Sequence, residues 1–91
     1  MTTPTHIIDS VSTVDSRHVA KAAVGVLDRI QGESAGVQIQ TFAMLFLIIS
    51  EQFGVDIREE LQRAERVMRD ADDFYKPEVR ALREYVRGEL S

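Results

Sequence analysis

An uninterrupted run of eight apolar residues, FAMLFLII at 42–49, constrains the fold of this chain more than any other feature. A run of this kind has to be covered, because contiguous apolar surface is unfavourable in water. It is too short to cross a bilayer, since a spanning helix needs about 20 apolar residues and the polar residues Ser50-Glu51-Gln52 follow directly. A buried strand, a buried helix and a surface made for another protein remain as explanations.

The residues around this run favour a helix. The segment AGVQIQTFAMLFLIISEQFG contains no proline and ends at Gly54, the usual kind of residue where a helix stops. We therefore expect a helix at about 35–53. At 100° per residue its core face consists of Ile39, Phe42, Phe46, Ile49 and Phe53. The opposite side carries Met44, Leu47 and Ile48, so the helix is apolar nearly all round and is expected at the centre of the fold.

Three more helices are expected, at about residues 16–31, 57–75 and 77–90. The first of them starts at Asp15 or Ser16, because either side chain can accept hydrogen bonds from the free N–H groups of a first helical turn. Its apolar side consists of Val19, Ala23, Val26, Leu27 and Ile30.

The helix at 57–75 has the clearest amphipathic pattern in the chain. Its apolar stripe advances in steps of four and three and consists of Ile57, Leu61, Ala64, Met68, Ala71 and Tyr75. Asp56 is expected to cap it, while Glu59 reaches back to the Asp56 N–H in a capping box. Lys76-Pro77 separates it from the last helix, because proline disfavours a helical conformation of the residue before it. The apolar stripe of that last helix consists of Val79, Leu82, Val86 and Leu90.

These helices predict one all-α domain, folded as a compact four-helix bundle or an orthogonal helical array around the central apolar helix. A chain of 91 residues can bury one modest core of this kind. Residues 15–91 are expected to form the helical domain. Residues 1–14 are expected to form an arm or a short helix. Their apolar residues have helical spacing, but the segment is rich in β-branched and hydroxyl residues, which favour a helix only weakly.

Composition narrows the functional classes. The net charge of −4 argues against non-specific binding to nucleic acid or anionic lipid. The chain has no cysteine, which excludes disulfides and thiolate metal sites and suits a reducing compartment. Its first residues, MTTPTHIIDSVSTVD, lack the basic and apolar regions of a signal peptide. We therefore expect a cytoplasmic protein.

No residue pattern in the chain indicates catalysis. His6 and His18 have no carboxylate, serine or second histidine at a spacing that would form a catalytic triad or a metal site. We therefore expect no enzymatic activity, no catalytic residue, no metal ligand and no cofactor.

Two surfaces are candidates for binding. The first is the side of the central helix formed by Met44, Leu47 and Ile48, which a small domain leaves uncovered unless its other helices close around it. A homodimer and a closed monomer both remain open. The second is a basic row on the last helix that could contact nucleic acid or an acidic partner, formed by Lys76, Arg80, Arg83 and Arg87. The nearby Glu84 and the acidic net charge disfavour nucleic acid.

Three segments together, TFAMLFLIISEQFGVD, RAERVMRDAD and KPEVRALREYVRGEL, resemble short uncharacterised helical proteins encoded by tailed bacteriophages. The resemblance covers most of the chain and rests on size and style. It implies a small accessory protein that acts by binding a host or phage macromolecule, and it carries over no binding or catalytic residue. The expected function is that of a non-enzymatic helical interaction protein that binds a protein partner. A nucleic-acid-binding module is the alternative.

Overall fold

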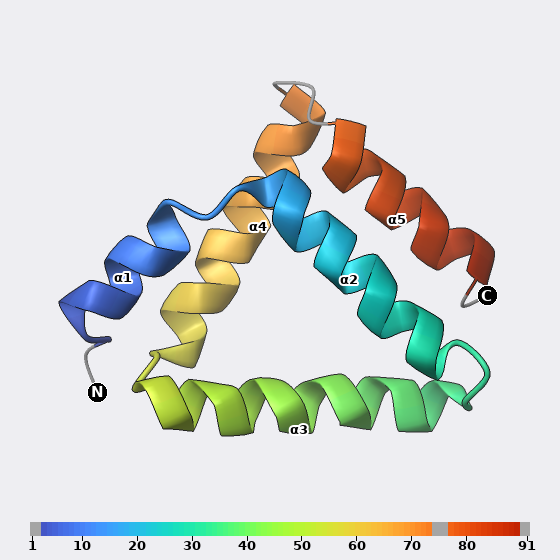
Figure 1. Ribbon diagram of the computed structural model, residues 1–91, viewed down its shortest axis with the longest axis horizontal. Coiled ribbons are helices and arrows are strands. Elements are labelled where there is room, and N and C mark those ends of the chain that lie inside the picture. The colour runs from blue at the N-terminus through green and yellow to red at the C-terminus, as the bar shows by residue number, and fades with distance from the viewer. Residues whose placement is uncertain (1–2, 74–76, 90–91) are drawn as a thin grey trace.

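The structure, a computed structural model, describes residues 3–73 and 77–89 (Figure 1). Within them the chain forms five helices and no strand, which confirms the all-α class: α1 (Thr5–Ser12), α2 (Ser16–Ile30), α3 (Ala35–Phe53), α4 (Ile57–Asp73) and α5 (Pro77–Glu89). The short α1 occupies the segment expected to be an arm or a short helix. Tyr75 and Leu90, expected near the ends of the last two helices, lie outside the described residues.

The helices form a flat, open frame. Figure 1 shows α3 as one side of a triangle, with α2 and α4 rising from its two ends and α5 running beside α2. The molecule measures 37 × 32 × 18 Å. Its radius of gyration is 13.9 Å, whereas about 12 Å is typical of a globular chain of this length. The helices are therefore more spread out than in a tight bundle.

The buried core of the described residues lies between α2 and α5. These two helices pack along one another, and α4 contacts α5 less extensively. The buried apolar residues are Ala20 and Leu27 from α2 and Val79 from α5, while Leu82 and Val86 are half-buried. The apolar stripe expected on α5 therefore does face the core.

The stripe expected on α2 is right only in part: Leu27 is buried and Ala23 and Ile30 are half-buried. Val19 and Val26 were assigned to the core, but they are 47% and 44% exposed. Ala20, which lies outside the expected stripe, is buried. The reason is that α5 packs on the side of α2 that carries Ala20 and Leu27, and successive helical positions point about 100° apart.

The expectation of a central apolar helix is also wrong for the single chain. On the expected core face of α3, Ile39 is 66% exposed, and Ile49 and Phe53 are each 52% exposed. Phe42 and Phe46 are less exposed, and the one buried residue of α3 is the polar Ser50. The physical reason is that helix packing in the described part of the chain joins α2 and α4 to α5, and no helix packs along α3.

The stripe on α4 is likewise covered only in part. Leu61 is 49% exposed and Ala64 is exposed, while Ile57 and Met68 are half-buried. The side chain of Ala71 lies outside the described residues. The single chain therefore leaves apolar surface open on two of the helices that were expected to meet in one core.

Neighbouring positions on α2 test this packing. Leu27→Ala should lower the free energy of unfolding by about 2–5 kcal/mol, because it empties part of the contact with α5. Val26→Ala is the matched control and should change it by less than about 1 kcal/mol, because its side chain is largely in water. Urea unfolding followed by circular dichroism measures both. A loss on Val26→Ala equal to that on Leu27→Ala would contradict the observed orientation of α2.

Candidate functional site

The candidate site is helix α3. Its first turn is held by polar contacts at the junction with α2, which form the first of two corners. Ser34 caps α3, accepting a hydrogen bond from the Val37 N–H at 3.3 Å. The Gln38 side-chain amide lies 3.1 Å from the carbonyl oxygen of Ile30 and 3.0 Å from that of Glu33, and donates to both. These carbonyls belong to the end of α2 and the turn after it, where helical partners are missing. Gln38 thus fastens the start of α3 to the end of α2.

The last turn of α3 is fixed by a second corner. Gly54 ends the helix in the left-handed conformation, with φ of 69°, as its sequence position predicted. The Val55 N–H then donates to the Ser50 carbonyl oxygen at 2.8 Å. A Cβ atom on Gly54 would lie 3.3 Å from Cδ of Pro4, so the N-terminal segment packs directly on this turn.

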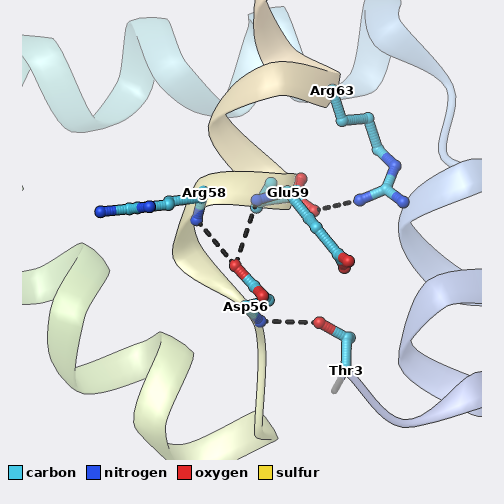
Figure 2. A network of polar contacts seen from close by, with 6 residues as sticks. Thr3, Asp56, Arg58, Glu59 and Arg63 are labelled. Atoms are coloured by element: carbon cyan, nitrogen blue, oxygen red, sulfur yellow. Dashed lines mark hydrogen bonds and ion pairs between the residues drawn. The ribbon is translucent and has the colours of Figure 1, made fainter. Parts of the chain in front are cut away.

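Thr3 completes the second corner (Figure 2). It is buried, and its hydroxyl oxygen accepts a hydrogen bond from the Asp56 N–H at 2.6 Å. The Asp56 carboxylate accepts from the backbone N–H groups of Arg58 at 3.0 Å and Glu59 at 3.3 Å. The start of α4 is therefore tied both to its own cap and to the N-terminal segment.

The predicted capping box is half right. Asp56 caps α4 as expected, but its own N–H is bonded to Thr3, and the Glu59 side chain remains exposed. Thr3 is 53 positions away in the chain, so a local sequence pattern does not show that Thr3, and not Glu59, accepts the hydrogen bond from the Asp56 N–H. Arg63 forms its ion pair with the half-buried Glu60, at 2.6 Å.

Between the two corners α3 is apolar and largely in water. The candidate face of Met44, Leu47 and Ile48 is 58%, 47% and 56% exposed, respectively. No charged residue occurs from Ala35 to Ser50. The large exposed apolar residues of α3 are Val37, Ile39, Phe42, Met44, Leu45, Leu47, Ile48, Ile49 and Phe53.

The exposed apolar surface of α3 is extensive and runs round the helix. Each of its nine large exposed apolar residues keeps about half its side chain in water, so together they expose on the order of 800 Å². The largest apolar patch on a typical monomer is roughly 300–600 Å² and is often functional. The nine residues lie on opposite sides of the helix and form no single patch, and they make α3 a candidate binding surface.

A shallow groove of about 530 Å³ adjoins the exposed stripe of α4. It is lined by the apolar residues Leu61, Ala64 and Met68 and the charged residues Glu65, Arg69 and Arg83. The sequence pattern had assigned the three apolar residues to the core. In the structure they form the floor of an open groove between α4 and α5.

One arginine of the basic row is paired with an acidic side chain. Arg80, Arg83 and Arg87 lie exposed on α5, and Lys76 lies outside the described residues. Arg87 pairs with Glu84 at 2.8 Å. Arg80 and Arg83 have interaction partners as well. This part of α5 therefore presents paired charges of both signs.

Tyr85 links the ends of α5 and α2, and the sequence patterns did not single it out. Its hydroxyl donates a short hydrogen bond to the Asp28 carboxylate and lies 3.4 Å from the side-chain oxygen of Gln31. The bond to Asp28 raises the pKa of Tyr85 to about 12, because ionisation would remove the donated proton and place two negative charges together. In the sequence, the only indication of this contact is that Tyr85 directly precedes Val86, a member of the apolar stripe of α5.

A comparison with known proteins gives no match to a family model, a curated protein or a solved structure. Within residues 3–73 and 77–89, none of the helices has the length and apolar character that crossing a membrane requires. The same described part of the chain holds no group of three or more His, Asp or Glu side chains placed to bind a metal ion.

Gly54 tests the second corner. Gly54→Ala should lower the free energy of unfolding by about 1–2 kcal/mol, because alanine is disfavoured at positive φ and its methyl group would press on Pro4. Gly25→Ala is the control: nothing lies within 4 Å of its Cβ position inside α2, so it should raise stability by about 0.5–1 kcal/mol. Urea unfolding of both variants checks the opposite signs. An unchanged Gly54→Ala stability would contradict the corner.

Tyr85 gives a pH-dependent prediction. Tyr75→Phe leaves Tyr85 as the only tyrosine, and its ultraviolet absorbance should titrate near pH 12 in the folded protein and near 10.0 in urea. Because the folded pKa lies above the unfolded one, the Asp28 bond stabilises the fold fully below pH 10.0 and this contribution disappears as pH rises to about 12. Asp28→Asn in the same background should return the midpoint toward 10.0. An unshifted midpoint before that change would contradict the bond.

Proposed function

We propose that the protein is a small, non-enzymatic helical interaction protein that binds another protein chain through α3. The observation that supports this function best is the exposed apolar helix held at both ends. Its ends are fixed by the hydrogen bonds of Gln38 and by the Gly54 corner, while its middle is in water. Burial of apolar surface is the main favourable term in most protein association. A helix already folded also loses little conformational freedom on binding.

The chemistry of α3 suits a protein partner better than the other classes. Nucleic acids and anionic lipid surfaces attract Lys and Arg, and α3 carries neither from residue 35 to its end. The cores of protein interfaces are depleted in charged residues and enriched in aromatic residues and Met. Phe42, Met44 and Phe53 on α3 fit that composition.

A partner would also account for the bundle pattern of the sequence. An apolar helix predicted to be central, but exposed in the single chain, becomes central once another chain covers it. We propose that the full helical bundle forms in the complex. The resemblance to phage accessory proteins implies a host or phage macromolecule as the partner. The absence of cysteine suits a cytoplasmic setting.

The alternative, nucleic-acid or acidic-partner contact through Lys76, Arg80, Arg83 and Arg87, has less support. Within that row, Glu84 pairs with Arg87 at 2.8 Å. An arginine that is paired with a carboxylate must exchange this partner for a phosphate, which reduces the free energy gained on binding nucleic acid.

A matched pair of variants separates the two functions. Leu47→Glu places a charge on the apolar face of α3 and should abolish recovery of specific partner chains by the tagged protein. Arg80, Arg83 and Arg87 changed together to Glu should leave that recovery intact. Mass spectrometry of proteins bound from a host lysate, with the untagged chain added to detect self-binding, measures both. Circular dichroism checks that each variant keeps its helices.

The reverse result would overturn the proposed function. The protein would then be retained on nucleic acid at about 0.15 M salt, and the triple Arg variant would lose retention while Leu47→Glu kept it.

A further inference from the structure

We infer that residues 3–12 form a strap that can leave the corner between α3 and α4, with Glu59 taking over the hydrogen bond that Thr3 makes to the Asp56 N–H. The strap consists of Thr3, Pro4 and the helix α1. It is a conformational device of the fold, and it does not depend on which partner covers α3.

The strap is attached to the corner by two neighbouring residues. Thr3 is 5% exposed, and its hydroxyl oxygen accepts from the Asp56 N–H at 2.6 Å (Figure 2). The Pro4 ring packs on the turn at Gly54, where a Cβ atom would lie 3.3 Å from Cδ of Pro4. The Pro4 carbonyl oxygen also accepts from two N–H groups in the first turn of α1, each at 3.0 Å. Thr3, Pro4 and α1 are therefore one continuous unit, which Thr3 and Pro4 hold on the corner.

The rest of the strap has few contacts with the frame. α1 contains no buried residue, and its apolar residues Ile7, Ile8 and Val11 are only half-buried. Within the described residues, the extensive helix packing joins α2 and α4 to α5 and does not include α1. Figure 1 shows α1 outside the triangle formed by α2, α3 and α4. Release of the strap therefore breaks few apolar contacts besides those of Thr3 and Pro4.

A second acceptor for the Asp56 N–H is provided by α4 itself. Asp56 is the N-cap of α4, because its carboxylate accepts from the N–H groups of Arg58 and Glu59. Glu59 is the third residue of that helix, and from this position a glutamate side chain reaches back to the N–H of the cap residue. The Glu59 side chain is exposed and has no hydrogen bond or ion pair among the described residues. It can accept from the Asp56 N–H once Thr3 leaves, so release does not strand a backbone donor.

The strap also holds the connection between α3 and α4. This connection is the segment 54–56; Pro4 packs on its first residue and Thr3 bonds to its last. In the described part of the chain, α3 and α4 are not among the helices that pack along one another. Without the strap, the angle between them is held only by the local turn at 54–56. Release therefore allows α4 to turn relative to α3, which changes how the exposed apolar residues of these two helices are presented together.

Hydrogen exchange of the Asp56 N–H, measured by NMR, tests the change of acceptor. Thr3→Val removes the hydroxyl at nearly constant volume, and Thr3→Ser is the matched control that keeps it. In Thr3→Val the exchange rate should stay within about threefold of the wild type, because Glu59 takes over, whereas in Thr3→Val combined with Glu59→Ala it should rise at least about tenfold. Thr3→Ser and Glu59→Ala alone should leave the rate unchanged.

Three results would overturn the takeover by Glu59. The first is a rate that rises as much in Thr3→Val as in the double variant. The second is a rate that rises in neither of them. The third is a rise in Glu59→Ala alone, because Thr3 would then not be the acceptor in the wild type.

NMR relaxation of the backbone amides measures release of the strap itself. In the wild type and Thr3→Ser, the N–H groups of α1 should relax like those of α2, and in Thr3→Val they should relax like a mobile segment. Residual dipolar couplings of α3 and α4 should fit a single alignment tensor in the wild type and require two in Thr3→Val. The Leu27 N–H in the core should keep its protection from exchange in every variant.

The outcomes separate the strap from a merely structural contact. An α1 that stays ordered in Thr3→Val would overturn the strap. Loss of Leu27 protection in Thr3→Val would overturn it as well, because residues 3–12 would then be part of the folded core. A single alignment tensor for α3 and α4 in Thr3→Val would overturn the hinge between them.

Discussion

The anchoring of α3 at its two ends is the constraint on which the rest of this structure depends. At one end the Gln38 amide bonds to carbonyl oxygens at the end of α2 and in the following turn. At the other, Gly54 in its left-handed conformation and the Thr3 bond to Asp56 set the exit into α4. These bonds engage backbone groups at the ends of the helices. They hold α3 as one side of the frame although few apolar contacts hold its middle.

The apolar contacts that stabilise this frame are unevenly distributed. Its buried apolar contact is concentrated between α2 and α5, where Ala20, Leu27 and Val79 are enclosed. Apolar side chains on α3 and α4 are folded into place yet remain in water. In a domain this small, most of the available hydrophobic stabilisation depends on covering such surface. Association of the kind proposed for α3 would therefore stabilise the fold as well as perform its function, because a partner that binds the folded state shifts the unfolding equilibrium.

The charged residues contribute mainly to solubility and local order. Arg87 and Glu84 form an ion pair between exposed side chains, and pairs of that kind add little to stability. The ion pair of Arg63 and Glu60 is less exposed to solvent. The Tyr85 hydroxyl and Asp28 join the two helices of the core near its edge. None of these groups lies on the middle of α3, so the polar and apolar surfaces of the protein are separated along the chain.

The sequence by itself determined the features that depend on near neighbours. Helical periodicity located α2 to α5, and the local chemistry of Asp15, Asp56 and Gly54 identified three helix ends correctly. Such features were predictable because each depends on residues within about one helical turn.

Only the tertiary structure decided which apolar faces meet. Val26 and Leu27 are adjacent and both apolar, so periodicity could not tell which one faces α5. A helix that is apolar nearly all round has no single preferred direction, and the sequence therefore could not reveal that α3 lies at the edge of the frame. The bond between Thr3 and Asp56 joins distant parts of the chain, so it exists only once the fold has brought them together. Packing is a competition among all apolar faces at once, and a local pattern does not decide its outcome where a helix offers more than one such face.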